Sequence, residues 1–328
     1  MNRITMYNKS RIEYIDIAKG IGILLMVIGH MVSIFPIRQF IFQFHMPMFL
    51  IFSGFLFNDK KWGGEKTFTL FLQTRFRQLL VPYVCFFIII LVVSLLQKPD
   101  FDYITTIYNG PPPAIWFLLD LFIVEILFWI VNRINSNTYF HIINIFIVLF
   151  IGRWFEISNI SFPYCLSSIP VCYVFYGLGF LSRQFDFITS YQDIDRKKTF
   201  VYAITQLFIV MLYVIITKNH TDLMFNHIEL RGYITAFLGT SGIVGLSVII
   251  QSESNKMGRL LRWIGQNSIS FIGLNCLLIG ICDIIIKPYM PSFSVYKGIQ
   301  FIITISVCAL FALFANRYIP FMVGKIYK

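Results

Sequence analysis

Long apolar runs separated by short polar segments make up most of the chain, and this pattern predicts a helical membrane protein. An apolar run of about 20 residues is long enough to cross the hydrocarbon core of a bilayer as an α-helix. The longest polar segments, roughly 58–77, 183–198 and 218–230, are too short to form a separate domain. We therefore expect residues 1–328 to form one all-α polytopic membrane bundle of about ten transmembrane helices. The predicted spans are 15–36, 39–57, 78–97, 115–132, 140–155, 164–182, 199–217, 231–250, 264–286 and 298–320.

The composition agrees with this interpretation and excludes an ordinary soluble domain. Only 13% of the residues are charged, whereas soluble domains carry about 25%. The net charge of +11 arises mainly on one side of the predicted topology, because 20 of the 27 Lys and Arg residues lie on the side that holds both termini. By the positive-inside rule this side is the cytoplasm. We expect a multi-pass protein of the bacterial cytoplasmic membrane, and its basic residues require no nucleic-acid partner.

Lys19, His30 and His45 are ionisable residues inside predicted spans, where such residues are costly and usually mark a working site. Lys19 and His30 are eleven residues apart, about three helical turns, so they share one face. Asp16 lies about 60° from Lys19 on the same side. The rise of about 16 Å places His30 near the middle of the bilayer. The predicted turn near 36–38 lies midway between the two histidines, so we expect their imidazoles at one depth on adjacent antiparallel helices.

Further ionisable or aromatic residues lie in or beside the next two spans. Arg75 and Arg77 precede the third span on the basic side, where topology alone explains them. Asp120 and Glu125 lie within the fourth span, so we expect them to pair with a cation or a polar helix neighbour inside the bundle. Trp116 begins that span at the outer interface, where aromatic residues are common.

Standard motifs give no sign of metal or phosphate-loop chemistry. None of the six cysteines forms a CxxC pair or a Cys/His cluster. The sequence has no Gly-rich phosphate loop, no HExxH and no GxSxG. We therefore expect no metal cofactor.

Several short motifs together identify a family. Lys19 and His30 form a pattern of a basic residue, ten intervening residues and a histidine. Other motifs are Tyr14-Ile15-Asp16, Gly29-His30, Phe44-His45-Met46-Pro47, Ser53-Gly54-Phe55, Arg75-Phe76-Arg77, Trp116-Phe117-Leu118 and Ile264-Gly265 with Asn267-Ser268. This set resembles the membrane-bound acyltransferase-3 family, and within it the fucose-4-O-acetylase-like branch. The last motif departs from the family because no histidine follows it, and we expect Asn267 and Ser268 to cap the ninth span.

The resemblance implies a membrane O-acyltransferase that takes an acyl group, usually acetyl from acetyl-CoA, on the cytoplasmic side. The acceptor would be a hydroxyl of a cell-surface polysaccharide or of a lipid-linked glycan precursor in the membrane lipid. For this reaction we expect His30 to act as general base and Asp16 to belong to the same catalytic group. His45 would orient the hydroxyl, donate to the oxyanion or pass the proton. Direct transfer and a transient acyl-histidine both remain open.

The same resemblance gives roles to the remaining residues. Lys19, Arg75 and Arg77 are expected to hold the phosphates of coenzyme A. Trp116, Asp120 and Glu125 are expected to contribute to acceptor binding, Trp116 by stacking on a sugar ring. The alternative functions are a non-enzymatic transporter or exporter of glycans or lipids, and a structural subunit of a glycan-assembly complex. Inverted repeats would favour a transporter, and the sequence shows none.

Overall fold

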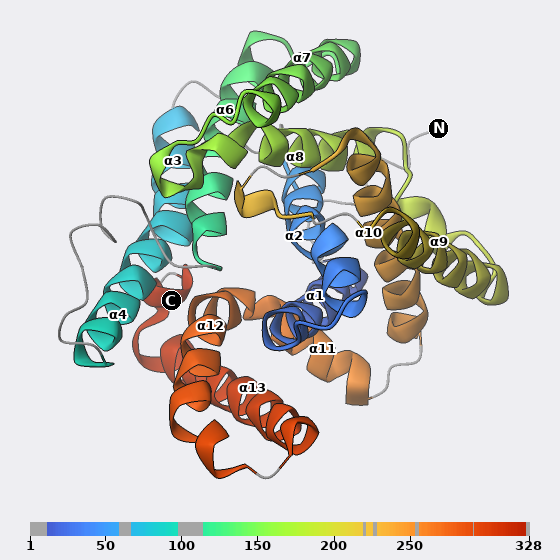
Figure 1. The fold of residues 1–328 in the computed structure, drawn as a ribbon. Coiled ribbons are helices and arrows are strands. Elements are labelled where there is room, and N and C mark those ends of the chain that lie inside the picture. Colours follow the sequence, from blue (N-terminus) through green and yellow to red (C-terminus); the bar gives the residue numbers. More distant parts are fainter. Residues whose placement is uncertain are drawn as a thin grey trace.

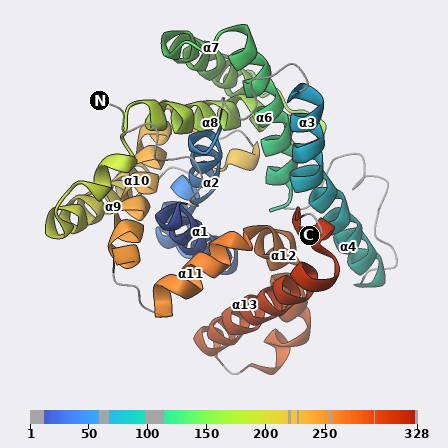
Figure 2. The same cartoon turned by 180° about the vertical axis from the view of Figure 1, so that it is seen from behind.

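The computed structural model describes residues 12–58, 67–97, 114–218, 221–225, 228–252, 256–290 and 292–325, which form a bundle of helices (Figures 1 and 2). The long helices are α1 (Glu13–Met31), α2 (Ile37–Phe55), α4 (Val81–Gln97), α6 (Trp116–Ile134), α7 (Thr138–Ile157), α8 (Ile169–Gln184), α9 (Arg196–Thr217), α10 (Leu230–Ser252), α12 (Ser268–Ile285) and α13 (Phe293–Tyr318). The shorter elements are α3 (Thr67–Arg75), η3 (Phe76–Leu80), η4 (Pro163–Ser168), η5 (Thr189–Gln192), η6 (Leu223–Phe225), α11 (Lys256–Gln266), η7 (Lys287–Tyr289) and η8 (Pro320–Val323).

Each of the ten predicted spans coincides with one of the long helices. In the described part of the chain, eight helices are long and apolar enough to cross a membrane, which confirms a polytopic helical bundle. The other two predicted spans are α2 and α6. Helix α2 carries Arg38, Gln39 and Gln43 beside its histidine, and α6 carries three charged residues, Asp120, Glu125 and Arg133. Both helices also bring candidate site residues into the bundle, His45 from α2 and Asp120 and Glu125 from α6.

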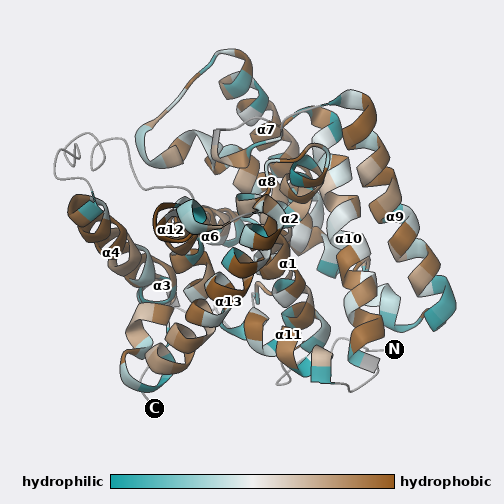
Figure 3. Ribbon diagram, turned by 60° about the horizontal axis from the view of Figure 1, so that its bottom comes forward, coloured by the Kyte–Doolittle hydropathy of each residue, from teal (hydrophilic) through white to brown (hydrophobic). Residues whose placement is uncertain are grey.

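Helix α1 lies near the centre of the molecule and packs against α2, α10, α11 and α12 (Figure 1). In its apolar stretch 67% of the residues are buried, compared with 22% in α9 at the periphery. Figure 3 shows α4 and α9 apolar along much of their length, including the sides that face away from the bundle. Exposed apolar side chains on peripheral helices face lipid in a membrane protein. The central position of α1 keeps its ionisable residues away from lipid.

Two pairs of glycines allow the central helices to touch backbone to backbone. A Cβ at Gly20 of α1 would lie 2.0 Å from the carbonyl oxygen of Leu261 in α11, and one at Gly265 would lie 1.9 Å from that of Asp16. Helices α2 and α8 are joined in the same reciprocal way through Gly54 and Gly179. Membrane helices commonly use small residues for such close approach. These contacts fix α1 and α2, the two helices that carry the candidate histidines.

The structure corrects two predictions of where helices begin. Residues 67–75 belong to helix α3, which continues through η3 into α4, whereas the sequence predicted a polar loop to residue 77. The ninth span begins at Ser268 rather than 264, because the preceding residues form the amphipathic helix α11. Asn267 occupies the N-cap position of α12 as predicted, but its side chain makes no capping hydrogen bond there. Its side chain donates to the Trp263 carbonyl and accepts from Asn316 and Lys325, which ties α11 to the end of α13.

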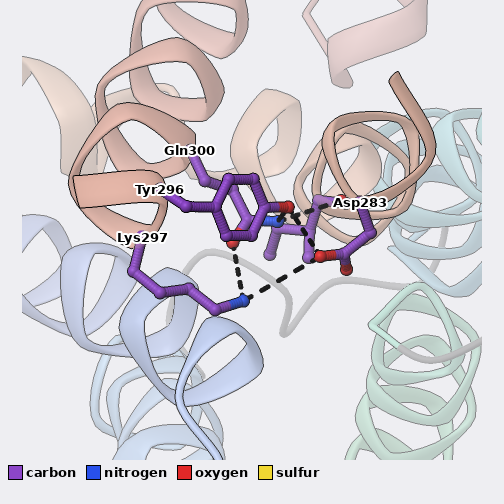
Figure 4. A network of polar contacts seen from close by, with 5 residues as sticks. Asp283, Tyr296, Lys297 and Gln300 are labelled. Atoms are coloured by element: carbon purple, nitrogen blue, oxygen red, sulfur yellow. Dashed lines mark hydrogen bonds and ion pairs between the residues drawn. The ribbon is translucent and has the colours of Figure 1, made fainter. Parts of the chain in front are cut away.

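The opposite end of the α12–α13 pair is held by a network of polar side chains (Figure 4). The hydroxyl of Tyr296 donates to Asp283 at 2.6 Å, and the amide of Gln300 donates to Tyr296 at 2.8 Å and to the Ile279 carbonyl at 3.1 Å. Lys297 donates to Gln300 at 2.9 Å. Each side chain bonds within the network, so we assign it to holding the two helices together rather than to chemistry.

Candidate active site

His30 and His45 lie side by side at one end of the bundle. The turn of residues 32–36 reverses the chain between α1 and α2, and it brings the two ring centroids to 6.4 Å. The ring of Phe42 packs against both, with centroids 5.6 Å from His30 and 4.9 Å from His45. The expectation that the two imidazoles reach the same depth on adjacent helices is confirmed. Along α1, His30 occupies the last turn.

The ring of His45 has a defined orientation. Its Nδ1 lies 3.0 Å from the carbonyl oxygen of Ile41, one turn earlier in α2. A carbonyl oxygen only accepts hydrogen bonds, so Nδ1 carries the proton and Nε2 of the neutral ring is left as an acceptor. The side chain is 2% exposed. His45 therefore presents a fixed lone pair, and His30 makes no hydrogen bond to other described residues.

Both histidines line one cavity of about 200 Å³. Trp116 contributes from the start of α6, and Asp222 and Met224 contribute from the segment between α9 and α10. Arg38 also lines the cavity, lies within electrostatic reach of His30 and is exposed, so it stands at the mouth. Pockets for whole drug-sized ligands occupy about 300–1,000 Å³. This cavity has room for an acyl group and a reacting hydroxyl, but not for an entire coenzyme.

A second charged group forms nearer the end of the bundle where α1 begins. The Nε of Arg75 lies 2.8 Å from a carboxylate oxygen of Glu125, which is buried halfway along α6. Lys19 is within electrostatic range of the same carboxylate. Arg75 also donates to Gln78 at 2.9 Å. Glu125, predicted to bind acceptor, thus forms an ion pair with Arg75 and lies within electrostatic range of Lys19, two residues predicted to hold coenzyme A. Arg77 is exposed and pairs with no other described residue.

Asp16 and Asp120 lie outside the histidine cavity. Asp16 accepts from the Gln266 amide at 3.0 Å, and fourteen residues of helix separate it from His30, a rise of about 21 Å. This distance corrects the expectation that Asp16 belongs to the catalytic group. Asp120 is fully buried and accepts from the hydroxyl of Ser168 and, at 3.9 Å, from the thiol of Cys172. It lies one turn below Trp116 and does not line the cavity.

The comparison with known proteins identifies the family. A family described as an acyltransferase domain matches residues 12–316, which include both histidines and every other candidate residue. The chain belongs to the acyltransferase-3 family. It is also similar to the nodulation protein NolL of Mesorhizobium japonicum, with 30% identity over 187 residues, or 52% of this chain and 47% of NolL. The chain thus matches about half the length of this curated relative, and no solved structure matches it.

Sequence reasoning missed two charged residues of the acyltransferase cavity. Arg38 lies at the predicted turn between the first two spans, and Asp222 lies in a polar segment predicted as a loop, so neither was expected to line a site. The signal available for Arg38 was a charge beside an apolar span, which many residues of this sequence share. Among the described residues, no three His, Cys, Asp or Glu side chains come together as a metal site. The two imidazoles of the cavity can transfer protons and form hydrogen bonds.

Proposed function

We propose that this membrane acyltransferase is an O-acetyltransferase of the fucose-4-O-acetylase-like branch. It would move an acetyl group from acetyl-CoA to a hydroxyl of a cell-surface polysaccharide or of a lipid-linked glycan precursor. The observation that carries the proposal is the pair of imidazoles, 6.4 Å apart, lining one cavity within the acyltransferase domain. A sugar hydroxyl is a poor nucleophile and needs a base within hydrogen-bond reach.

In the proposed reaction His30 is the general base. It takes the proton as the hydroxyl oxygen attacks the thioester carbon. The carbon–sulfur bond then breaks, and the coenzyme A thiolate takes the proton back from the imidazolium. His30 is suited to this step because its ring nitrogens make no hydrogen bond to other described residues. Its partial burial leaves it accessible to substrate from the cavity.

The geometry of His45 narrows its role. Because Nδ1–H is committed to the Ile41 carbonyl, Nε2 of the neutral ring accepts a hydrogen bond and cannot donate one to the oxyanion. We propose that His45 orients the acceptor hydroxyl, or that it takes the proton of this hydroxyl and passes it to His30. A carbonyl partner on the second nitrogen is a common device for fixing an imidazole in one tautomer.

We further propose that coenzyme A binds from the end of the bundle where α1 begins, which the distribution of Lys and Arg assigns to the cytoplasm. Lys19, Arg75 and Arg77 would hold its phosphates. Lys19 stands about 16 Å along α1 from His30. The pantetheine arm, which is long and thin, would cover that distance and carry the thioester to the cavity.

Purified protein in nanodiscs, supplied with acetyl-CoA and envelope glycan from a strain lacking the gene, tests the proposal. We expect release of the coenzyme A thiol together with a mass increase of one acetyl unit per modified sugar. Protein that binds glycan but never releases thiol would contradict the proposal and favour transport or assembly.

A further inference from the structure

A short segment distant in sequence from the histidines forms one wall of the cavity. Residues 221–225 lie between α9 and α10, and the short gold ribbon beside α2 in Figure 1 is part of this segment. The hydroxyl of Thr221 donates to the side-chain oxygen of Gln43 at 2.6 Å. The amide nitrogen of Gln43 donates to Thr235 at 2.8 Å and to the Gly232 carbonyl at 3.1 Å.

Gln43 therefore fixes the wall relative to the histidines. It is 1% exposed, lies two residues before His45 on α2, and its amide group bonds to both the wall and the first turns of α10. Buried side-chain amides that use both their oxygen and their nitrogen hold their partners in one arrangement. The segment beyond Thr221 is thus a defined surface of the cavity.

This wall brings a carboxylate to the cavity. Asp222 lines the cavity, and one of its oxygens accepts from the backbone N–H of Met224 at 3.1 Å, which orients the side chain. Arg38 also lines the cavity, and its guanidinium lies 4.8 Å from the centre of the Phe42 ring. With Trp116, the lining thus combines an anion, a cation and a large aromatic ring.

These groups suit a sugar better than coenzyme A. A carboxylate accepts hydrogen bonds from neighbouring hydroxyls, and a guanidinium donates to ring and hydroxyl oxygens. An indole offers an apolar face to the C–H side of a sugar ring. The phosphates of coenzyme A would be repelled by Asp222, and its pantetheine arm has no pair of adjacent hydroxyls for that carboxylate to bind.

Building on the proposed O-acetyltransferase function, we propose that Asp222 and Arg38, together with Trp116, form the acceptor subsite. The acceptor is a sugar with adjacent hydroxyls. It enters at the end of the bundle where α1 ends and meets the thioester, which arrives from the opposite end, at His30 and His45. Asp222 and Arg38 select the sugar, and the histidines carry out the chemistry.

The test is a pair of titrations on purified protein in nanodiscs with radiolabelled acetyl-CoA. The acceptor is envelope glycan from a strain lacking the gene, and the variants are Asp222→Asn, Asp222→Glu and Arg38→Gln. We expect Asp222→Asn and Arg38→Gln to raise the KM for glycan about 10- to 100-fold, the effect of losing a charge-assisted hydrogen bond. The KM for acetyl-CoA should stay within about twofold, and Asp222→Glu should recover part of the loss. Glu229→Gln is the matched control, because Glu229 is an exposed acid near the same segment that does not line the cavity.

Each outcome decides between the two proposals. Wild-type protein that transfers no acetyl group contradicts the proposed function itself. Wild-type transfer with an unchanged glycan KM in Asp222→Asn and Arg38→Gln overturns the acceptor subsite alone. If the KM for acetyl-CoA rises as much as the KM for glycan, Asp222 and Arg38 bind the donor, and the acceptor subsite is also overturned. If Asp222→Asn fails to give a monodisperse protein, Arg38→Gln alone decides by the same two KM values.

Discussion

At the scale of residues, His30 and His45 share a cavity because each stands close to one reversal of the chain. Their separation in sequence is spanned by a single turn, so counting residues from that turn was enough to predict their common depth. Asp16 shows the limit of the same reasoning. A shared helix face says nothing about separation along the axis, and about 21 Å of rise keeps Asp16 away from the histidines.

The shared cavity predicts how losses at the two histidines combine. Loss of a general base commonly costs about 10² to 10⁴ in rate, and residues that act as a unit lose activity non-additively. We expect His30→Ala to lower thiol release by this factor and the double variant His30→Ala, His45→Ala to be little worse. The measurement is the rate of thiol release by purified variants whose size-exclusion profiles match that of the wild-type protein. Additive losses would mean that the two rings serve separate steps.

Arg75 and Arg77 are two positions apart in the sequence, but the structure predicts different consequences for removing them. Arg75→Gln leaves the buried Glu125 carboxylate without its ion pair, and we expect it to destabilise the protein by about 1–3 kcal/mol, less than a fully buried pair because Arg75 is partly exposed. The double variant Arg75→Gln, Glu125→Gln should recover most of this stability. Arg77→Gln should leave stability within about 0.5 kcal/mol and weaken acetyl-CoA binding.

Thermal unfolding and acetyl-CoA titration of the same preparations separate these effects. Equal stability of the Arg75 and Arg77 variants would show that the ion pair with Glu125 contributes little. Unchanged acetyl-CoA affinity in both would remove them from the donor site and leave membrane topology as the explanation of these cations.

At the scale of elements, two of the helices that form the site, α2 and α6, carry several polar or charged residues within an apolar span. Gln39, Gln43 and His45 of α2 and Asp120 and Glu125 of α6 are buried, so they face the bundle rather than lipid. The long apolar runs of the sequence therefore predicted the position of every long helix. The polar and ionisable residues inside those runs indicated where a functional site would lie. The ninth predicted span began at Ile264, but Ile264 and Gly265 are buried residues at the end of α11, which packs against α1.

The close contact of α1 and α11 predicts a large cost for a single methyl group. Gly20→Ala would place a Cβ 2.0 Å from the Leu261 carbonyl oxygen, so the helices must separate. We expect a loss of about 1–3 kcal/mol, as for overpacked cores, with lower activity because α1 carries His30. Gly280→Ala and Gly298→Ala are matched controls, since nothing lies within 4 Å of the added Cβ at either position.

The controls should be neutral or stabilising by up to about 1 kcal/mol, because alanine is the better helix former. Thermal unfolding in detergent ranks the stability of the three variants. Gly20→Ala as stable as Gly280→Ala would mean that α1 and α11 are not in backbone contact.

At the scale of the whole molecule, the bundle has two chemically different ends. The cations predicted to hold coenzyme A lie toward the end where α1 begins, and the histidine cavity with Arg38 and Asp222 lies where α1 ends. The numbers of Lys and Arg residues in the predicted loops indicated that the two ends differ in charge. The wall formed by residues 221–225 could not be predicted, because the bond from Thr221 to Gln43 joins residues 178 positions apart and no local pattern encodes such a contact.

The central claim is that acetyl transfer takes place at His30 within this bundle. The most direct measurement is mass spectrometry of surface glycans from cells that lack the gene and carry either wild-type protein or His30→Ala at equal membrane levels. Wild-type protein should restore glycan species heavier by one acetyl unit, and His30→Ala should leave them at the level of the deletion. Near-normal acetylation with His30→Ala would contradict the assignment of the active site to this histidine.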